Sequence, residues 1–360
     1  MAPLIRAVND SSSLKAVTCS TGQHRELLHQ VLEFFEIENH HTLNVMKPNQ
    51  DLFDVTGSLL SQLRDVLVKA APDLVLVQGD TTTAFVTALC ASYLKIPIGH
   101  VEAGLRTFDK ASPFPEELNR TLISKCADYH FAPTELAKKN LLQEGIGSSR
   151  IFRVGNTGVD ALLWAAGAQT QDSFLSQLLP SQKKWILFTS HRRENFGAPM
   201  EALFSAVRQF AESHPQWQIV FPVHPNPNVK RLAQEKLGDC SGITLLEPLD
   251  FGDLVWVLQR VAFVVTDSGG LQEEAPTFGK PILVMRETTE RTEAITAGCA
   301  ELVGVEPQKL LHWMEQLSQT QSLTYHRMAR AQNPFGDGTA SQQIVKILET
   351  SFAKKTVQAA

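Results

Sequence analysis

The sequence lacks the cysteine patterns that mark disulfide-bonded and zinc-binding proteins. Its 360 residues contain five cysteines, an odd number without any CxxC pair: Cys19, Cys90, Cys126, Cys240 and Cys299. Such a set does not form a regular disulfide framework, and no cluster of His, Cys and Asp has the spacing of a metal site. This usage fits the reducing cytoplasm, and we expect no bound metal.

Three further absences exclude whole classes of protein. No apolar run reaches the roughly 18 residues of a membrane-spanning helix, and the first residues lack the pattern of a secretory signal. The net charge is −5 and the 33 basic residues are dispersed, so nothing indicates binding to nucleic acid or to a membrane surface. Neither GxGxxG nor GxxxxGK[ST] occurs, which leaves a nicotinamide cofactor and a P-loop without support. We expect a cytoplasmic protein with a small ligand and no cofactor.

What is present indicates an α/β protein of two domains. The chain is long for one core and 43% of it is hydrophobic. Short runs of Val, Ile and Leu alternate with amphipathic segments of helix length, as in parallel sheets covered by helices. The strands we expect are Lys15–Thr18, Asp73–Val77, Ile96–His100, His130–Ala132, Ile151–Val154, Trp185–Thr189, Gln218–Val223, Ile243–Leu246, Phe263–Thr266 and Pro281–Met285.

The segment Ala165–Ser181 loses apolar periodicity and gathers Gln, Ser, Gly and Pro, so we place a hinge near it. The expected domains are residues 1–164, joined by a C-terminal helix at 338–354, and residues 165–337. Two doubly wound sheets would meet at a cleft formed by the carboxyl ends of their strands, where open α/β sheets bind ligands.

Polar motifs follow the predicted strands of the first half. In VLVQGDTTTA, Asp80 comes directly after a strand, and in HVEAGLR, Glu102 follows the next strand. Adjacent turns would bring both carboxylates to one rim, where different environments can separate their pKa values for acid and base roles. The plainer alternative is that Asp80 and the threonines after it cap a helix.

The motif SPFPEELNR predicts a turn that leads into a helix. Glu116 and Glu117 would lie in its first turn, and Glu116 and Arg120, four residues apart, would share a helix face. An acid beside a cation could serve catalysis, although acids at a helix N-terminus are also ordinary complements of the helix dipole.

Three motifs of the second half also follow strands. FTSHRRENFG contains His191, PVHPNPNV contains His224, and VVTDSGGLQEEAP places Ser268, Gly269 and Gly270 before a helix. Glycines there let backbone amides approach a phosphate. Glu274 would lie one helical turn along, where a carboxylate can accept both hydroxyls of a ribose, and Arg291 is a candidate counter-charge for a diphosphate. Solvated charges and a tight turn are the structural alternatives.

The motifs taken together resemble one family. QGDTTTA, HVEAGLRT, SPFPEELNR, HRREN, PVHPNP, EPLDF, TDSGGLQEEAP, GKPILVMR and NPFGDG, in this order, are similar to the non-hydrolysing UDP-N-acetylglucosamine 2-epimerases of bacteria. The resemblance implies two Rossmann-like domains of the glycosyltransferase-B type, a homodimer, and reversible conversion of UDP-GlcNAc to UDP-ManNAc for surface polysaccharide. The ligands would be these two nucleotide sugars and UDP.

The resemblance also assigns roles to residues. Asp80, Glu102, Glu116 and His191 fall on positions implicated in catalysis. Positions that hold substrate or UDP correspond to Arg120, His224, Ser268, Gly269, Gly270, Glu274 and Arg291. The implied route eliminates UDP from C1 while a carboxylate removes the C2 proton, and UDP then adds back to the 2-acetamidoglucal. A glycosyltransferase of the same fold, a hydrolysing epimerase and a silent UDP-sugar binder are the alternatives.

The resemblance raises one expectation about the start of the chain. Family members ordinarily begin with an apolar strand and a loop of the form GTRPEAIKMAPL, whereas this chain starts at Met1-Ala2-Pro3-Leu4. We therefore expect the first strand of the N-terminal sheet, and a loop with an arginine and a lysine, to lie in about 15 to 20 residues before Met1. A truncated, inactive paralogue that lacks them is the alternative.

Overall fold

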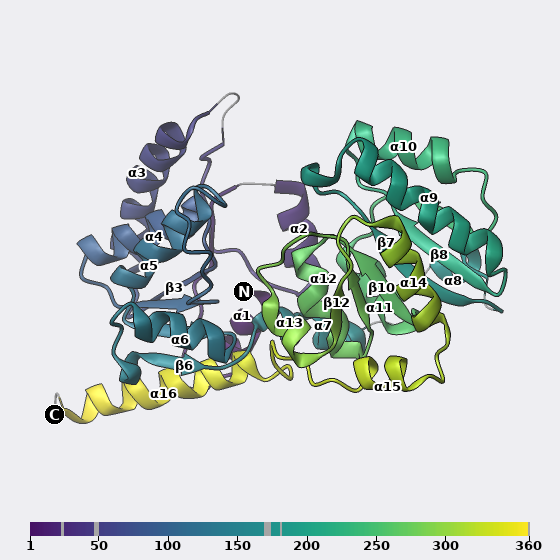
Figure 1. The fold of residues 1–360 in the computed structure, drawn as a ribbon. Coiled ribbons are helices and arrows are strands. Elements are labelled where there is room, and N and C mark those ends of the chain that lie inside the picture. Colours follow the sequence, from purple (N-terminus) through teal and green to yellow (C-terminus); the bar gives the residue numbers. More distant parts are fainter. Residues whose placement is uncertain (23–24, 47–49, 169–173, 181, 359–360) are drawn as a thin grey trace. The chain divides into compact units, whose positions relative to one another are not determined.

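The computed structural model of the protein describes residues 1–22, 25–46, 50–168, 174–180 and 182–358. The chain divides into two compact units, Met1–Ala161 with Phe335–Ala360, and Leu162–Pro334. Each unit contains a parallel sheet with helices packed against it (Figure 1). The predicted α/β class is therefore confirmed. None of the helices in the described part of the chain has both the length and the apolarity to cross a membrane.

The main sheet of the first unit has four parallel strands in sequential order: β3 (Val75–Gln78), β4 (Ile98–Val101), β5 (Tyr129–Ala132) and β6 (Ile151–Arg153). Alternate side chains point to opposite faces, so Val75 and Val77 join one apolar cluster while Leu74 and Leu76 join another. The first cluster includes side chains of α3 (Leu52–Ala70), α4 (Thr82–Tyr93) and α5 (Glu116–Cys126), and the second those of α1 (Ala2–Asn9) and α16 (Ala340–Gln358). Helices thus cover both faces of this sheet.

The first unit also holds a small separate sheet. Its two parallel strands are β1 (Cys19–Ser20) and β2 (His41–Thr42), and α2 (Arg25–Phe34) lies between them in the chain. The predicted strand Lys15–Thr18 is wrong, because only Cys19 and Ser20 lie opposite partners in β2. We did not predict β2, since two residues carry no visible alternation. The remaining helices near this unit are α6 (Glu135–Gln143) and α7 (Thr157–Ala168), with a short η1 (Ser148–Arg150).

The second unit has a six-stranded parallel sheet in the order β12-β11-β10-β7-β8-β9. The strands are β7 (Lys184–Thr189), β8 (Trp217–Pro222), β9 (Ile243–Leu246), β10 (Phe263–Thr266), β11 (Ile282–Val284) and β12 (Ala300–Leu302). The chain first builds outward from β7 to β9, and then from β10 to β12 in the opposite direction. The strand order therefore reverses between β7 and β10, which is where doubly wound sheets bind ligands.

Large apolar side chains fill the core of the second unit. Phe188, Phe204 and Phe221 form a cluster of edge-to-face ring contacts with centroids 4.7 to 5.7 Å apart. The helices of this unit are α8 (Leu175–Leu178), η2 (Arg193–Asn195), α9 (Ala198–Ser213), α10 (Pro227–Leu237), α11 (Phe251–Arg260), α12 (Gly269–Glu274), η3 (Ala275–Phe278), α13 (Thr292–Ala297), α14 (Pro307–Ser318) and α15 (Leu323–Ala329).

The other nine predicted strands are confirmed to within about two residues at each end. Both bounds agree for β9 and β10. The strand β12 was not predicted, because its three residues include Glu301 and do not stand out as apolar.

Candidate active site

In the first unit, two predicted carboxylates lie at one edge of the sheet. Asp80 follows β3 and Glu102 follows β4, and these strands are hydrogen-bonded neighbours with Gln78 opposite Val101. The Gln78 amide donates to Glu102 Oε2 over 3.5 Å. A Cβ atom on Gly79, the residue before Asp80, would lie 3.7 Å from the same oxygen. The structure therefore brings the turns that carry Asp80 and Glu102 together.

The backbone at this edge has an unusual conformation. Glu102 has φ of +65°, a left-handed conformation that residues other than glycine seldom adopt. Gly104 has φ of +93°, and a Cβ atom there would lie 2.2 Å from the carbonyl oxygen of Ala137. Such conformations concentrate at functional sites, where the surrounding structure holds the chain in place. The close approach of α6 to Gly104 is one of the contacts that fix this turn.

A buried histidine contacts the backbone of the Gly79–Asp80 turn. His100 is fully buried on β4, and its Nε2 lies 2.8 Å from the carbonyl oxygen of Gly79. Burial lowers the pKa of His100 to about 3, so the ring is neutral at neutral pH and its Nε2–H donates to that oxygen. His100 thereby holds the Gly79–Asp80 turn and is too deeply buried to meet a ligand.

Arg120 connects this edge to α5. Its guanidinium pairs with the Asp80 carboxylate and lies 3.4 Å from Glu117 Oε2. The neighbouring Asn119 amide donates to the backbone oxygen of Asp80 over 2.9 Å. Glu116 and Arg120 lie one turn apart on α5, and the ion pairs of Arg120 go to Asp80 and the buried Glu117. Thr81, rather than Asp80, caps α4 by accepting from the amide of Ala84.

The two glutamates at the start of α5 differ sharply in environment. Glu117 is only 2% exposed and accepts hydrogen bonds, each of 3.0 Å, from the backbone amides of Thr107 and Phe108. It ties the loop after Glu102 to the first turn of α5. Glu116 is partly exposed, and within the described residues its side chain has no hydrogen bond or ion pair to protein. Glu116 is therefore the carboxylate free to meet a ligand, and Glu117 fixes the loop.

In the second unit, predicted residues gather where the strand order reverses. Thr189 at the end of β7 is in register with Thr266 at the end of β10, so the residues that follow lie side by side. His191 Nδ1 is 2.9 Å from Oδ1 of the buried Asp267. The rings of His191 and His224 stack with centroids 5.5 Å apart and 19° between their planes. Burial, followed by the neighbouring His191, lowers the pKa of His224.

The Ser268–Gly270 turn leads into α12 and lies beside a cationic side chain. Ser268 is the residue before α12, and its hydroxyl does not cap the helix. A Cβ atom on Gly269 would lie 3.2 Å from Cζ of Arg291. The Arg291 guanidinium pairs with Glu273 at 2.9 Å and with Glu290 at 2.7 Å. Because Gly269 has no side chain, its backbone is not covered on this side. The guanidinium of Arg291 lies next to it.

Glu274 is the last residue of α12, and its side chain lies close to this turn. A Cβ atom on Gly270 would lie 3.6 Å from Glu274 Oε1 and 3.9 Å from the Ser268 hydroxyl. Burial, together with the like charge of Glu273, raises the pKa of Glu274 to about 7. The ionised form of this carboxyl group is therefore poorly solvated in the folded protein.

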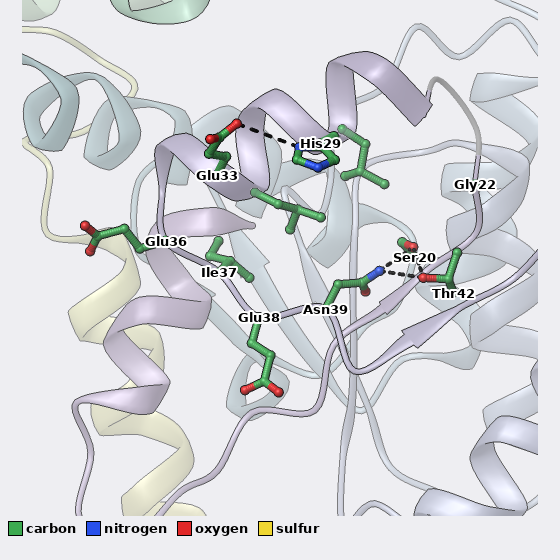
Figure 2. Close-up of a pocket in the computed structure, with 11 residues that line it drawn as sticks. Ser20, Gly22, His29, Glu33, Glu36, Ile37, Glu38, Asn39 and Thr42 are labelled. Atoms are coloured by element: carbon green, nitrogen blue, oxygen red, sulfur yellow. Dashed lines mark hydrogen bonds and ion pairs between the residues drawn. The ribbon is translucent and has the colours of Figure 1, made fainter.

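A cavity of about 630 Å³ lies elsewhere in the first unit, between α2 and the small sheet (Figure 2). Leu28, Leu32 and Ile37 line it, with Glu33 and Glu36 among the polar residues. In Figure 2, Asn39 joins Ser20 to Thr42 across one side, and His29 pairs with Glu33 on the other. None of the predicted site residues lines this cavity.

Two features of the site were not predicted from the sequence: the role of Asp267, and the difference between Glu116 and Glu117. The carboxylates of Asp267 and Glu117 are both buried and accept several hydrogen bonds. The sequence held a signal for Asp267, since it directly precedes SGG at the end of an apolar strand. It held none that distinguishes two adjacent glutamates.

The two parallel α/β units, one with a Rossmann strand order and a glycine turn at its reversal point, define a protein of the glycosyltransferase-B-like class. A family model described as UDP-N-acetylglucosamine 2-epimerase matches residues 6–349. The chain belongs to this family.

Individual relatives match over almost their whole length. The UDP-N-acetylglucosamine 2-epimerase of Escherichia coli strain K12 is 46% identical over 358 residues, which are 98% of this chain and 95% of the relative. The crystal structure of UDP-GlcNAc 2-epimerase from Neisseria meningitidis bound to UDP-GlcNAc is 43% identical, with a TM-score of 0.88 over 97% of this chain and 96% of that one. The enzyme from Methanocaldococcus jannaschii in complex with UDP-GlcNAc and UDP is 33% identical, with a TM-score of 0.78 over 97% and 95%.

Proposed function

We propose that this protein interconverts UDP-GlcNAc and UDP-ManNAc by inverting C2 of the sugar. The observation that carries the proposal is the group of acidic side chains that follow β3 and β4 in the first unit. The chain's membership of this family gives these acids their expected role. Asp80 and Glu102 follow neighbouring strands, and Glu116 is a carboxylate whose side chain has no partner among the described residues. Inversion of a carbon that bears hydrogen needs one group to remove a proton and another to supply one.

The C2 hydrogen is not adjacent to a carbonyl, so simple abstraction would leave an unstabilised carbanion. In the proposed route a carboxylate takes the C2 proton, the C–H electrons form the C1–C2 double bond, and the C1–O bond breaks to release UDP. UDP then adds back to C1 of the 2-acetamidoglucal while C2 is protonated on its opposite face. Asp80, Glu102 and Glu116 are the proposed acid and base groups, with His191 as a further catalytic group.

The second unit supplies the proposed nucleotide contacts. The backbone of Ser268, Gly269 and Gly270 would bind the diphosphate with Arg291 as counter-charge, and His224 would lie on the substrate side of His191. Glu274 would accept the two ribose hydroxyls, because an ionised carboxylate is a strong acceptor for paired donors. Arg120, held by Asp80 in the first unit, is the remaining proposed substrate contact.

We also propose that the protein acts in the cytoplasm and supplies ManNAc units for surface polysaccharide. All five cysteines are free, which supports a reducing compartment.

The protein is further proposed to be a homodimer. Support comes from apolar side chains exposed on the adjoining helices α3 and α4, among them Phe53 at 86% and Tyr93 at 73%. Sedimentation analysis should give twice the chain mass, and Phe53→Glu should weaken the dimer. Leu323→Glu, at a site in the second unit that is 89% exposed, is the matched control and should leave it intact.

Proton NMR of UDP-GlcNAc incubated with the protein tests the proposed activity. We expect UDP-ManNAc to appear and the same equilibrium mixture to form from either epimer. Free ManNAc with UDP would indicate a hydrolysing epimerase, and transfer to an added sugar acceptor would indicate a glycosyltransferase. UDP binding without any turnover would indicate a silent binder, and each of these three results would contradict the proposal.

A further inference from the structure

The buried carboxylate of Asp267 does two different things with its two oxygens. One of them, Oδ2, accepts hydrogen bonds from several residues at the start of the loop that carries His191. It accepts from the amides of His191 at 2.9 Å and Arg192 at 3.0 Å, from the Ser190 hydroxyl at 3.2 Å, and from the Asn195 amide at 3.5 Å. Ser190 and Asn195 are themselves buried. This oxygen therefore fixes the backbone from which the His191 side chain projects.

The other oxygen, Oδ1, is left for the imidazole of His191. It lies 2.9 Å from Nδ1 and has no aligned hydrogen bond from any other described group, although it is shielded from water. The Nδ1–Oδ1 contact is at ion-pair distance rather than a well-aligned hydrogen bond. A buried carboxylate oxygen without a donor is costly, and the Nδ1–H of His191 is the group placed to satisfy it.

The charge of Asp267 suits this arrangement. Burial alone would raise its pKa, but the contacts with His191 and the donated backbone amides together lower it. The carboxylate is therefore ionised at neutral pH and accepts hydrogen bonds only. A neutral imidazole next to it carries its proton on Nδ1, which leaves the lone pair on Nε2.

The neighbouring ring limits the alternative orientation. His224 stacks against one face of His191, so a flip that exchanged Nδ1 for Cδ2 would have to occur against this contact. His191 remains about one-third exposed, and its Nε2 has no protein partner among the described residues. The exposed nitrogen is thus Nε2.

We propose that Asp267 is a positioning residue that holds His191 in its Nδ1–H tautomer and presents Nε2 to the substrate. The inference rests on the proposed function for its chemical purpose. A fixed Nε2 can accept a proton, or donate one when the ring is protonated, at one defined place beside the Ser268–Gly270 turn. In serine proteases the same pairing of a buried aspartate with Nδ1 of a catalytic histidine sets the tautomer, and loss of the carboxylate lowers turnover by about 10⁴-fold.

The tautomer can be measured directly by two-bond nitrogen–proton correlation spectra of protein labelled with ¹⁵N-histidine. His191→Gln and His224→Gln variants would assign the two signals. In the wild-type protein we expect the neutral ring of His191 to carry its proton on Nδ1. In Asp267→Asn, a side-chain amide can donate to Nδ1, and the proton should move to Nε2. Ser190→Ala, which removes a donor from Oδ2 only, should keep the wild-type tautomer.

Turnover gives the second readout. Asp267→Asn should lower kcat by at least about 10²-fold with KM changed less than threefold, and it should add little to the loss already caused by His191→Gln, as residues that act as a unit are not additive. Ser190→Ala should stay within a few-fold of wild type.

A wild-type ring protonated on Nε2 would overturn the proposal, and that spectrum needs no variant to fold. An unchanged tautomer in a folded Asp267→Asn, or losses that multiply in the double variant, would overturn it as well. The spectra also separate this inference from the proposed function, because an inactive protein with the expected tautomers would reject the activity and retain the positioning role.

Discussion

The acids of the first unit show how burial divides residues that look equivalent in the sequence. Glu116 and Glu117 are adjacent, yet Glu117 is enclosed and bonded to two backbone amides while Glu116 has no side-chain partner among the described residues. The helix start was predictable from the prolines before it. Which acid faces inward depends on how the loop after Glu102 folds back onto α5, and no local pattern encodes that contact.

This difference predicts opposite behaviour for two matched substitutions. Glu116→Gln should lower kcat by roughly 10²-fold or more, as expected for a lost acid or base, with an unchanged melting temperature. Glu117→Gln removes an acceptor from buried amides and should lower the free energy of unfolding by about 1–3 kcal/mol. Steady-state kinetics and thermal melts of both variants measure the pair. Near-wild-type turnover for Glu116→Gln would remove it from the proposed catalytic group.

Glu102→Gln tests the acid on the strained turn. We expect a fall in kcat of roughly 10²-fold or more with UDP affinity retained, because the amide keeps the shape of the side chain and loses only the proton transfer. Equal losses of UDP binding and turnover would instead indicate that Glu102 supports the fold of the unit.

The raised pKa of Glu274 predicts how the stability of the protein and its affinity for UDP depend on pH. Its pKa in the folded protein is about 7, above the ordinary 4.5. The folded state therefore binds this proton more tightly than the unfolded state does. The stability that this group contributes is fully present below about pH 4.5 and is lost as the pH rises to about 7.

If Glu274 binds the ribose as a carboxylate, UDP binding near pH 6 must release its proton. Titration calorimetry in buffers of different ionisation enthalpy should detect this release, and UDP affinity should fall by up to about tenfold per pH unit below 7. Glu274→Gln should bind weakly at every pH and release no proton. Proton release that persists in Glu274→Gln would assign the titration to another group.

At the scale of the elements, most of the sheet strands were predictable because buried parallel strands are continuous apolar runs. The runs at Ile243–Leu246 and Phe263–Thr266 coincide with β9 and β10. The short strands β1, β2 and β12 were misplaced or missed, because pairing rather than local composition defines them. The strand order of the second unit was also not encoded locally, although the motifs after β7 and β10 were recognised.

Gly104 provides a test at this scale, because α6 approaches its Cα so closely. Gly104→Ala places a Cβ atom 2.2 Å from a backbone oxygen at a positive φ, and it should destabilise the protein by about 2 kcal/mol or more. Gly147→Ala, in the same unit at an exposed position before η1, is the control, because its φ is −63° and nothing lies within 4 Å of an added Cβ atom. It should be neutral or stabilise by about 0.4–1 kcal/mol. Denaturant unfolding of both variants gives the comparison, and equal stabilities would show that the turn at Gly104 adapts freely.

At the scale of the whole molecule, the predicted site residues belong to two different units. The first offers acids and Arg120 at the ends of β3 and β4, and the second offers a glycine turn, two histidines and a carboxyl group with a raised pKa at the reversal of its strand order. The family motifs were enough to single out these residues in the sequence. The contacts that hold each group in place came only from the three-dimensional structure, since residues far apart in the sequence, such as Ser190 and Asp267, make them.

The central claim is that C2 of the sugar loses its hydrogen during the reaction. Incubation of UDP-GlcNAc with the protein in deuterated water, followed by proton NMR and mass spectrometry, tests it most directly. We predict that deuterium appears at C2 of both UDP-ManNAc and recovered UDP-GlcNAc, with traces of 2-acetamidoglucal and UDP. UDP-ManNAc that retains its original C2 hydrogen would contradict the elimination route and the roles given to Asp80, Glu102 and Glu116.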